Sequence, residues 1–500
     1  MIARMDTLPQ ALYRARDLRE LDRLAITGHG IAGYALMTRA GESAFRQLRR
    51  SWPRARRIGV LCGGGNNGGD GLVLARIAHQ AGMSCAVLLV ADPARLQGEA
   101  RRAYEDLCAA GLTPQGFSGQ ARLQADVMVD ALLGTGLDRE VAGPWREAID
   151  WLNRQGAPVL ALDIPSGLHA DTGIPLGAAV RATATLSFVG LKQGLFTADG
   201  PDFSGRVAFD DLGLPAGVYA RCPQAAFRIT DRWIDLLLPA RPRNAHKGRY
   251  GHVLLVGGAP GMAGALRLAG EAAARAGAGL VTLATHPAHA AAVNAARPEL
   301  ICHAVADAKA LAPLLEHASV VAVGPGLGES AWGRPLLGAV MEGGWPLVMD
   351  ADALNRLARE PQRSERWILT PHPGEAARLL DTTVPAVQAD RFSAVRALQR
   401  RYGGVAVLKG AGSLVCSGEE AIALCDAGNP GMATGAMGDL LTGVIAGLLA
   451  QGLSAWEAAT AGVYLHARAG DLAAVEGERG LMAADLLAPL RHLVNPVRRT

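Results

Sequence analysis

The stretch Asn429–Gly443 reads NPGMATGAMGDLLTG, and it indicates the fold and the chemistry of the second half of the chain. Its glycines predict a turn, and the apolar run after them predicts a helix. The backbone N–H groups of Gly435, Met437 and Gly438 would then be free in the first helical turn, where the helix dipole favours an anion. Asp439 lies in the same turn, and its carboxylate would repel a bound phosphate. We therefore interpret Asp439 as a base that takes a proton from a hydroxyl attacking phosphorus. The alternative is an aspartate that only stabilises its helix.

The composition fits a globular protein of two or three domains. The chain has 500 residues, half of them hydrophobic, and a formal net charge of +4. This charge is small for the length, so we expect no nucleic-acid partner, and we read the basic cluster at residues 46–57 as a solvated helix end. The seven cysteines form no CxxC pair and no metal-binding spacing. They predict buried thiols in a reducing compartment.

Two patterns bear on the location of the protein. The N-terminal segment MIARMDTLPQALYRARDLRE carries charges where a signal peptide would need an apolar core. The least polar run, Leu440–Leu465, is interrupted at residues 451–454, which indicates two buried helices rather than one membrane span. We therefore expect a soluble, cytoplasmic protein that does not contact a membrane.

Strand-like and helix-like segments alternate along the chain. A helical pattern covers residues 17–41, and further helices are predicted at residues 72–82, at residues 264–277 and through LLTGVIAGLL. The strand-like segments are residues 58–62, 85–92, 126–134, 158–167, 184–192, 252–258, 280–286, 320–328, 346–355, 367–375 and 405–413. This alternation predicts, in each half, a mostly parallel sheet covered on both faces. We place the domain boundary near Pro223, which gives domains of residues 1–223 and 224–500.

The segment Gly63–Gly71, GGGNNGGDG, follows a predicted strand and contains G-x-G-x-x-G, and Asp92 closes the next strand. This combination is typical of dinucleotide-binding folds, so an NAD-dependent dehydrogenase is one interpretation of the first half. Such a fingerprint does not require Asn66, Asn67 and Asp70, however. Two amides and a carboxylate supply oxygen ligands for a hard cation, or hydrogen bonds to a ribose or phosphate. We predict that the segment binds a ligand.

Polar residues also follow other predicted strands of the first half. Asp130, Asp163 and Ser166 fall at strand ends, the edge where ligands bind in open α/β sheets. Each of them alone could be a turn cap, but together with the 66–70 segment they indicate one crevice. We expect Lys192 to face that crevice. The chain has only four lysines beside forty-six arginines, so a retained lysine indicates that a compact ammonium group is needed.

Several motifs resemble those of two known enzyme domains. GGGNNGGDG, VDALLGTGLDRE, LDIPSG and GLKQG resemble the NAD(P)H-hydrate epimerase domain, and HKGRYGHVLLVGG, GPGLG, PHPGE, KGAGS and GAMGD resemble the ADP-dependent NAD(P)H-hydrate dehydratase domain. In this order, over about residues 17–490, they are similar to the bacterial bifunctional NAD(P)H-hydrate repair enzymes. The resemblance implies an α/β protein with an N-terminal Rossmann-like three-layer αβα domain and a C-terminal ribokinase-like αβα domain.

The resemblance also implies the residues of both sites. Asn67, Asp130 and Ser166 would help to hold a potassium ion. The residues that would contact the hydrated dinucleotide in the first domain are Asn66, Asn67, Gly68, Gly69, Asp70, Gly134, Thr135, Gly136, Leu137, Asp138, Arg139, Glu140 and Asp163. In the second domain, the adenine nucleotide would contact Lys409, Gly410, Ala411, Gly412, Ser413 and Gly438, and the hydrate would contact Ala263, Gly326, His372 and Asp439. We predict Asp163 and Lys192 as catalytic residues of the first domain and Asp439 as that of the second.

The implied substrates are NADHX and NADPHX, which are NADH and NADPH after addition of water across a nicotinamide double bond. Phosphoryl transfer from ADP or ATP, with magnesium, would turn the new hydroxyl into a leaving group, and with ADP the products would be NAD(P)H, AMP and phosphate. The first domain would interconvert the R and S hydrates, because the second accepts only the S hydrate. We also expect a homo-oligomer.

One motif departs from the family pattern. The first helix of the family usually reads MENAG, and this chain has MTRAG, with Thr38 and Arg39 in the place of Glu and Asn. If these two side chains contact the epimerase crevice, the departure affects epimerisation. An alternative interpretation of the chain is therefore a ribokinase-like small-metabolite kinase fused to a non-catalytic nucleotide-binding scaffold domain.

Overall fold

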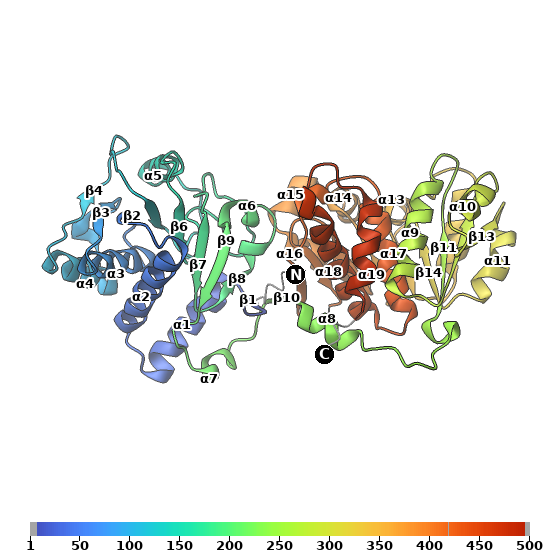
Figure 1. The fold of residues 1–500 in the computed structure, drawn as a ribbon, viewed down its shortest axis with the longest axis horizontal. Coiled ribbons are helices and arrows are strands. Elements are labelled where there is room, and N and C mark those ends of the chain that lie inside the picture. The colour runs from blue at the N-terminus through green and yellow to red at the C-terminus, as the bar shows by residue number, and fades with distance from the viewer. Residues whose placement is uncertain (1–7, 419, 496–500) are drawn as a thin grey trace. The chain divides into compact units, whose positions relative to one another are not determined.

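The computed structural model describes residues 8–418 and 420–495. The chain folds into two compact units, Met1–Phe227 and Arg228–Thr500, and each is an α/β unit built around a largely parallel sheet (Figure 1). The α/β class predicted from the alternating segments is confirmed.

The first unit is built around a parallel sheet with the strand order β4-β3-β2-β5-β6-β7-β9. Its strands are β2 (Arg57–Cys62), β3 (Ser84–Leu89), β4 (Gln115–Gly116), β5 (Val127–Ala131), β6 (Val159–Leu162), β7 (Ala184–Phe188) and β9 (Arg206–Asp210). Apart from this sheet, β1 (Ala11–Tyr13) pairs in parallel with β8 (Leu191–Lys192) and antiparallel with β10 (Ala226–Arg228).

Side chains of these strands alternate between two apolar cores. Val60 and Cys62 of β2 belong to the core that includes α2 and α3, whereas Leu61 between them belongs to the core under α5. A strand that is buried on both faces has this period of two, and helices therefore cover both sides of the sheet. The helices are α1 (Ala15–His29), α2 (Gly33–Ser51), α3 (Asn66–Gln80), α4 (Gly98–Ala109), α5 (Gly143–Asn153), α6 (Gly200–Ser204) and α7 (Ala216–Tyr219), with short 3-10 turns η1 (Pro93–Arg95) and η2 (Gln193–Phe196).

The start of α3 corrects the prediction for the glycine-rich segment. We expected a loop over residues 63–71 and a helix from residue 72, but α3 begins at Asn66, so Asn67 and Asp70 lie in its first two turns. Glycine has a low helix propensity, which favoured the loop. Tertiary packing overrides it, because a Cβ on Gly68 would lie 2.1 Å from the carbonyl oxygen of Gly63. The turn therefore needs glycine for close approach of the backbone.

The second unit has a parallel sheet with the order β13-β12-β11-β14-β15-β16-β17, extended by the antiparallel strands β18 and β19. The strands are β11 (His252–Val256), β12 (Leu280–Thr285), β13 (Ile301–Ala304), β14 (Val320–Val323), β15 (Leu347–Met349), β16 (Trp367–Leu369), β17 (Val405–Leu408), β18 (Ser413–Cys416) and β19 (Ile422–Cys425). The predicted strand segments were too long, because the polar residues after each strand belong to loops or helix starts.

Helices cover this sheet as well, in the αβα arrangement that we expected. They are α8 (Asp231–Leu237), α9 (Ala263–Ala276), α10 (Ala290–Ala296), α11 (Ala308–Glu316), α12 (Gly333–Glu342), α13 (Ala351–Arg359), α14 (Pro373–Leu380), α15 (Val384–Ala389), α16 (Arg391–Tyr402), α17 (Met437–Ala450), α18 (Ala455–Ala473) and α19 (Leu487–Leu493). The 3-10 turns in the described part of this unit are η3 (Lys247–Tyr250), η4 (Pro430–Met432), η5 (Ala474–Glu476) and η6 (Ala483–Leu486).

Helix α17 is buried and packs closely on α9. Its first residue confirms the predicted helix start, and its end at Ala450 confirms that the least polar run forms two helices, α17 and α18. A Cβ on Gly443 would lie 2.0 Å from the carbonyl oxygen of Ala269, and one on Gly447 would lie 2.6 Å from that of Ala273. These two glycines, one turn apart, therefore let the two helix backbones approach.

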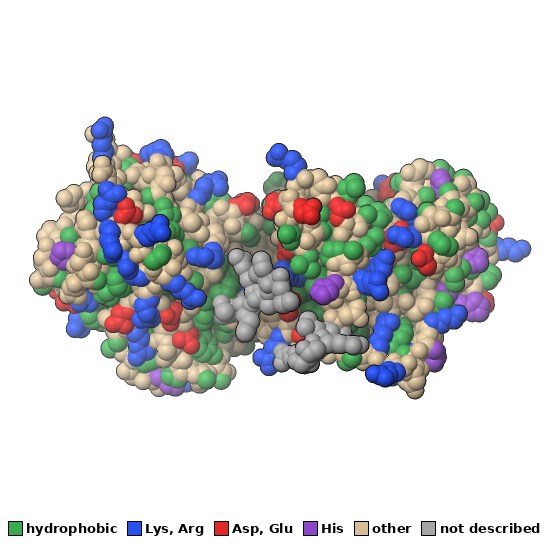
Figure 2. Space-filling model, in the orientation of Figure 1, with side chains coloured by type: hydrophobic (Ala, Val, Ile, Leu, Met, Phe, Trp, Pro, Cys, Tyr) green, Lys and Arg blue, Asp and Glu red, His purple; other side chains and the backbone are tan. Residues whose placement is uncertain are grey.

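In the face shown in Figure 2, Lys and Arg side chains are scattered and interspersed with acidic and apolar ones. Within residues 8–418 and 420–495, no helix is both long enough and apolar enough to cross a membrane.

Candidate functional site

A cleft of about 1070 Å³ lies in the first unit, at the carboxyl ends of β2, β5 and β6. Parallel strands end at the same edge, so the segments that follow them meet there. The predicted residues that line this cleft are Asn66, Asn67, Asp70, Gly134, Thr135, Gly136, Leu137, Asp138, Arg139, Glu140, Asp163 and Lys192. Gly68 and Gly69 are buried residues of α3, and Asp130 and Ser166 are fully buried.

Asp163 and Lys192 form an ion pair in the wall of the cleft. The side chain of Lys192 is 1% exposed, and its ammonium also donates hydrogen bonds of 3.0 Å to Ser187 Oγ and to the carbonyl of Phe188. Asp163 has a φ of 67°, a left-handed conformation that is strained for a residue with a side chain. The buried ammonium is therefore fixed, and the strained turn presents the Asp163 carboxylate to the cleft.

Asp130 and Ser166 form a buried hydrogen-bonded pair beside the cleft. Ser166 Oγ donates to Asp130 Oδ1 at 2.6 Å, and the Ser166 backbone N–H donates to Oδ2 at 2.8 Å. Burial raises the pKa of Asp130 to about 6. The Ser166 hydroxyl also accepts a hydrogen bond from the Leu133 N–H at 2.8 Å.

Asn67 completes this group of oxygen atoms. Its Nδ2 donates to the Leu133 carbonyl at 3.0 Å, so Asn67 and Ser166 both contact Leu133. Its Oδ1 is buried and has no hydrogen-bond partner in the described structure. An unpartnered buried acceptor costs free energy, and so does a buried carboxylate whose hydrogen-bond donors are neutral. A cation held by the oxygens of Asn67 and Asp130 would relieve both costs.

Thr38 and Arg39, the two departures within the MTRAG motif, do not line the cleft. Helix α2 contributes Gly33, Leu36, Met37 and Ala40 to the lining. The Thr38 hydroxyl instead donates to the Tyr34 carbonyl within the helix at 2.8 Å, and the Arg39 guanidinium donates to the Leu212 carbonyl at 2.9 Å. Contact of Thr38 and Arg39 with the cleft was the condition for an effect on epimerisation, and neither side chain is part of the cleft lining.

Asp92 does not act as the dinucleotide fingerprint would require. Its carboxylate accepts the Ala94 N–H at 2.9 Å and caps η1, and it is not part of the cleft lining. A local turn cap therefore accounts for this residue.

The site of the second unit is centred on Asp439, in the first turn of α17. The residue before the helix, Ala436, has a left-handed φ of 67°, and its carbonyl accepts the Leu440 N–H. The amides of residues 437–439 consequently have no intrahelical acceptor. Burial and the negative charge of Asp350 raise the pKa of Asp439 to about 6, although the ammonium of Lys409 lowers it.

Asp350 and Lys409 form an ion pair next to this turn. Lys409 Nζ lies 2.8 Å from Asp350 Oδ1, and the Thr442 hydroxyl donates to Oδ2 at 3.0 Å. Burial opposes ionisation of Asp350, but the charge and hydrogen bonds of Lys409 and Thr442 outweigh it and lower the pKa of Asp350. A Cβ on Gly438 would lie 3.0 Å from Lys409 Nζ. The ammonium therefore faces the first turn of α17.

Arg391 holds the KGAGS segment, residues 409–413, in place through hydrogen bonds to backbone carbonyls. It is 1% exposed, and its guanidinium donates to the carbonyls of Leu408 and Lys409 at 3.2 Å and of Gly412 at 3.4 Å. Burial lowers the pKa of Arg391 to about 10, which still leaves it charged at neutral pH. Ser413 Oγ donates to the Gly410 carbonyl at 2.9 Å. The loop is thus closed on itself with its carbonyls turned inward.

His372 is the cap of α14. Its Nδ1 accepts the Gly374 N–H at 3.0 Å, and Glu375 Oε2 accepts the His372 N–H at 2.8 Å. Burial lowers the pKa of His372 and raises that of Glu375. His372 therefore caps α14 in the structure, while its contact with the hydrate stays a prediction.

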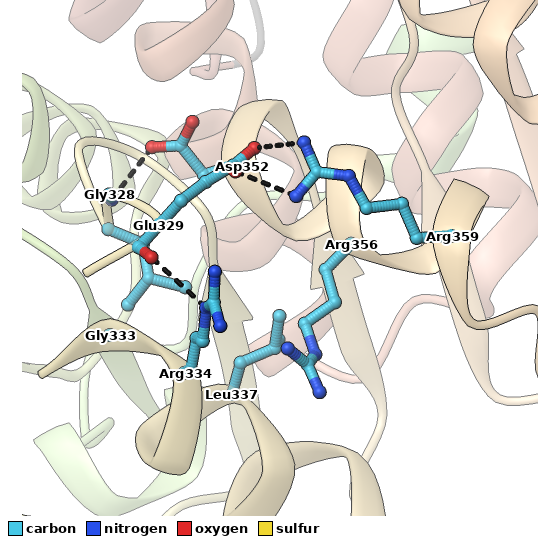
Figure 3. A pocket seen from close by; sticks show the side chains of 9 residues that line it. Gly328, Glu329, Gly333, Arg334, Leu337, Asp352, Arg356 and Arg359 are labelled. Atoms are coloured by element: carbon cyan, nitrogen blue, oxygen red, sulfur yellow. Dashed lines mark hydrogen bonds and ion pairs between the residues drawn. The ribbon is translucent and has the colours of Figure 1, made fainter. Parts of the chain in front are cut away.

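Ala263 and Gly326 come together where α9 begins. A Cβ on Gly326 would lie 2.6 Å from the carbonyl oxygen of Met262, the residue before Ala263. Figure 3 shows how the loop after Gly326 is fixed. The Asp352 carboxylate accepts the Gly328 N–H at 2.8 Å, and the neighbouring Glu329 pairs with Arg359 at 2.7 Å.

Several residues of this site were missed in the sequence. The charges near Asp439 and Lys409 include Asp350, Asp352 and Glu375. Arg391 donates a hydrogen bond to the Lys409 carbonyl in the KGAGS loop. The segment PLVMDADALN, residues 346–355, predicts one long strand, and this prediction obscures the role of Asp350 and Asp352. Two acidic residues at the end of an apolar run were the available signal, since polar residues at a strand end mark the ligand edge.

The chain is similar to known proteins in both of its units. It matches the family model described as NAD(P)H-hydrate dehydratase over residues 253–491 and the model described as YjeF-related protein N-terminus over residues 33–194. The bifunctional NAD(P)H-hydrate repair enzyme Nnr of Coxiella burnetii is 51% identical, covering 97% of this chain and 99% of the relative. The enzyme of the same name from Escherichia coli is 44% identical, covering 98% and 95%.

Solved structures match about half of the chain. A ribokinase-like superfamily protein from Enterococcus faecalis is 27% identical with a TM-score of 0.50, covering 53% of this chain and 94% of that one. An ADP/ATP-dependent NAD(P)H-hydrate dehydratase from Bacillus subtilis, co-crystallised with ATP and Mg²⁺, is 29% identical with a TM-score of 0.48, covering 53% and 96%.

Proposed function

Because this chain belongs to the bifunctional NAD(P)H-hydrate repair enzymes, we propose which of its residues carry the two reactions. The enzyme has an epimerase unit and a dehydratase unit and restores hydrated NADH and NADPH. The relatives match over nearly the whole chain, so a small-metabolite kinase fused to a scaffold is not favoured.

In the dehydratase unit we assign Asp439 as the general base. The observation that carries this assignment is that Asp439, the helix amides and the Lys409 ammonium converge on one turn. Asp439 takes the proton of the ring hydroxyl of the S hydrate while that oxygen attacks a phosphoryl group of ADP. The amides of residues 437–439 and Lys409 hold the negative charge that develops on the phosphoryl oxygens.

The transferred phosphate then becomes the leaving group. It departs with the electrons of the carbon–oxygen bond, and the neighbouring ring carbon loses a proton, which restores the double bond. The products from ADP are NAD(P)H, AMP and phosphate. Asp350 does not need to touch the substrate for this step, because it fixes the position and the charge of Lys409.

The nucleotide and the ions are further proposals. The loop formed by residues 409–413, with Gly438, would hold the adenine nucleotide. Magnesium would supply charge neutralisation on its phosphates. In residues 8–418 and 420–495 no group of three or more His, Cys, Asp or Glu side chains could hold a metal ion, so the phosphates themselves would be its main ligands.

In the epimerase unit, Asn67, Asp130 and Ser166 fit a potassium ion because of the unpartnered Asn67 oxygen and the buried Asp130 carboxylate. The ion would supply positive charge beside the cleft and order the segment at Leu133. The cleft would take the hydrated dinucleotide, with Asp163 and Lys192 as catalytic residues. We also propose a domain boundary near residue 223, a homo-oligomer and a cytoplasmic location.

The test uses the purified full chain with hydrated NADH, ADP and magnesium. We expect the absorbance of NADH to return, with one AMP and one phosphate formed per NADH. Formation of a stable phosphorylated product without recovery of NADH would instead identify a kinase. The same assay without the chain controls for spontaneous conversion.

A further inference from the structure

Helix α1 contributes a carboxylate to the cleft of the first unit that no motif identified. Asp22 lines the cleft together with Leu18 and Ile26. These residues follow one another at a spacing of four, so they share one face of the helix. Asp22 therefore reaches the cleft from an element that is separate from the strand ends bearing Asp163 and Lys192.

The surroundings of Asp22 differ from those of Asp163. Asp163 is fixed in an ion pair with Lys192. The Asp22 side chain is in contact with solvent, and the atoms of the cleft partly desolvate it. This desolvation and the negative charge of Asp163 raise the pKa of Asp22 to about 6, although the positive charge of Lys192 lowers it. Asp70 of α3 faces the same group, and burial, Asp163 and Asp22 raise its pKa as well.

Epimerisation of the hydrate places specific demands on this cleft. Addition of water to an enamine leaves the hydroxyl on the carbon that is bonded to the ring nitrogen. The hydrogen on that carbon is not acidic, so inversion requires the carbon–oxygen bond to break and to form again on the other face. A proton donor for the departing oxygen and a base for the incoming water are then both needed. Paired carboxyl groups in two protonation states meet such a demand in other enzymes.

We propose that Asp22 is a catalytic residue of the epimerase unit and shares proton transfer with Asp163. This proposal rests on the proposed function of the cleft. In one direction the Asp22 carboxyl gives its proton to the hydroxyl, water leaves, and the nitrogen lone pair forms a carbon–nitrogen double bond. Water then adds to the other face, its proton goes to the Asp163 carboxylate, and the electrons of the double bond return to nitrogen.

The proton balance closes without an oxidant or a reductant. The reverse direction exchanges the two roles, so Asp163 gives the proton and Asp22 accepts it. Between turnovers, the proton gained by one carboxyl and lost by the other is exchanged with water, which the solvent contact of Asp22 permits. Hydroxide alone is a poor leaving group, and the proton from Asp22 removes this obstacle.

The test compares Asp22→Asn with Glu20→Gln in the full chain. Glu20 is on the same helix and pairs with Arg23 at 2.6 Å, and it does not line the cleft. Each protein receives one separated epimer of hydrated NADH without ADP, so dehydration cannot occur, and chromatography follows the appearance of the other epimer. The kcat of Asp22→Asn should fall by about 100-fold or more, the usual scale for loss of an acid or base, with KM changed less than about threefold and Glu20→Gln close to wild type.

Three further readouts separate catalysis from structure. Asp22→Glu should recover part of the kcat, and dehydration of the S epimer with ADP should be unchanged in every variant. Asp22 is faced by Asp70, Asp163 and Lys192, and Arg19 lines the same cleft. In the wild-type pH profile of kcat, the limb that belongs to Asp22 should be absent in Asp22→Asn.

The possible failures are distinguishable. If wild type interconverts the epimers and Asp22→Asn keeps its kcat within about threefold, or raises only KM, the catalytic role is wrong while the function of the unit stands. If wild type does not accelerate interconversion over buffer, the proposed function of the cleft and the role of Asp22 both fall. Unchanged melting temperatures of the variants show that a lost kcat is not lost folding.

Discussion

The ammonium of Lys409 lies 2.8 Å from the carboxylate of Asp350 (Nζ to Oδ1) and 3.0 Å from the position that a Cβ on Gly438 would take. The two charged residues are 59 positions apart and follow different strands. Their pairing directs a positive charge at the amides of the α17 turn, which is the place where a phosphoryl group would be held.

Gly438→Ala should lower the kcat of the dehydratase. The new Cβ would lie 3.0 Å from Lys409 Nζ and 3.2 Å from Asp350 Oδ2, so the ion pair would have to move. We expect kcat to fall about tenfold or more, which corresponds to about 1.4 kcal/mol or more of lost transition-state stabilisation. The matched control is Gly435→Ala in the same turn, where a Cβ meets nothing within 4 Å. Equal kinetics for the two variants would contradict the role of the ion pair.

Asp439→Asn should remove the general base and keep the fold. The amide is similar in size but cannot accept the hydroxyl proton, so kcat should fall by about 100-fold or more. ADP binding, measured by calorimetry, should change little. Asp307→Asn is the control, because Asp307 caps the remote helix α11 and Asn caps helices equally well. Near-normal turnover of Asp439→Asn would show that this carboxylate is not the base.

The same variant should show a stability effect that depends on pH. Burial raises the pKa of Asp439 from 3.8 to about 6, so between these values the folded protein binds more protons than the unfolded chain. This stabilisation is present below pH 3.8 and is lost as the pH rises through 6. Relative to wild type, Asp439→Asn should therefore gain melting temperature from pH 4 to pH 6.5. A difference that stays constant over this range would mean that the pKa is not raised.

Asp130→Asn should weaken epimerisation and make it insensitive to exchange of potassium for sodium. The buried carboxylate is the only charged group among the three residues assigned to the ion, and its loss removes most of the attraction for a cation. Dehydration of the S epimer should be unchanged. Asp126→Asn serves as the control, because Asp126 pairs with Arg57 outside the cleft. An undiminished response to potassium in Asp130→Asn would exclude this residue as a ligand.

The two units should work as separate proteins. Each carries its motifs at its own strand ends, so we expect residues 224–500 alone to convert the S hydrate quickly and then stall. Adding residues 1–223 should restore full conversion without changing the initial rate. A stall by the intact chain at the same fraction would show that the first unit does not epimerise.

The sequence by itself determined the elements and the ligand edges of both sheets. The apolar runs and the glycine turn before α17 are local patterns, and the positions of Asp163, Lys192 and Asp439 at strand and helix ends were predicted from them. Their limits were less well predicted, since the helical conformation of Asn66–Asp70 depends on packing against Gly63 rather than on propensity.

Only the tertiary structure decided which side chains meet at those edges. Asp350 pairs with Lys409, Arg391 holds the carbonyls of the KGAGS loop, and Asp22 enters a cleft made by strands that follow it in the chain. None of these contacts has a sequence spacing that marks it, because each depends on the order of parallel strands and on the face that a helix turns toward them. The charges that set the pKa of Asp439 are likewise brought together by strand order, and the local sequence around Asp439 does not contain them.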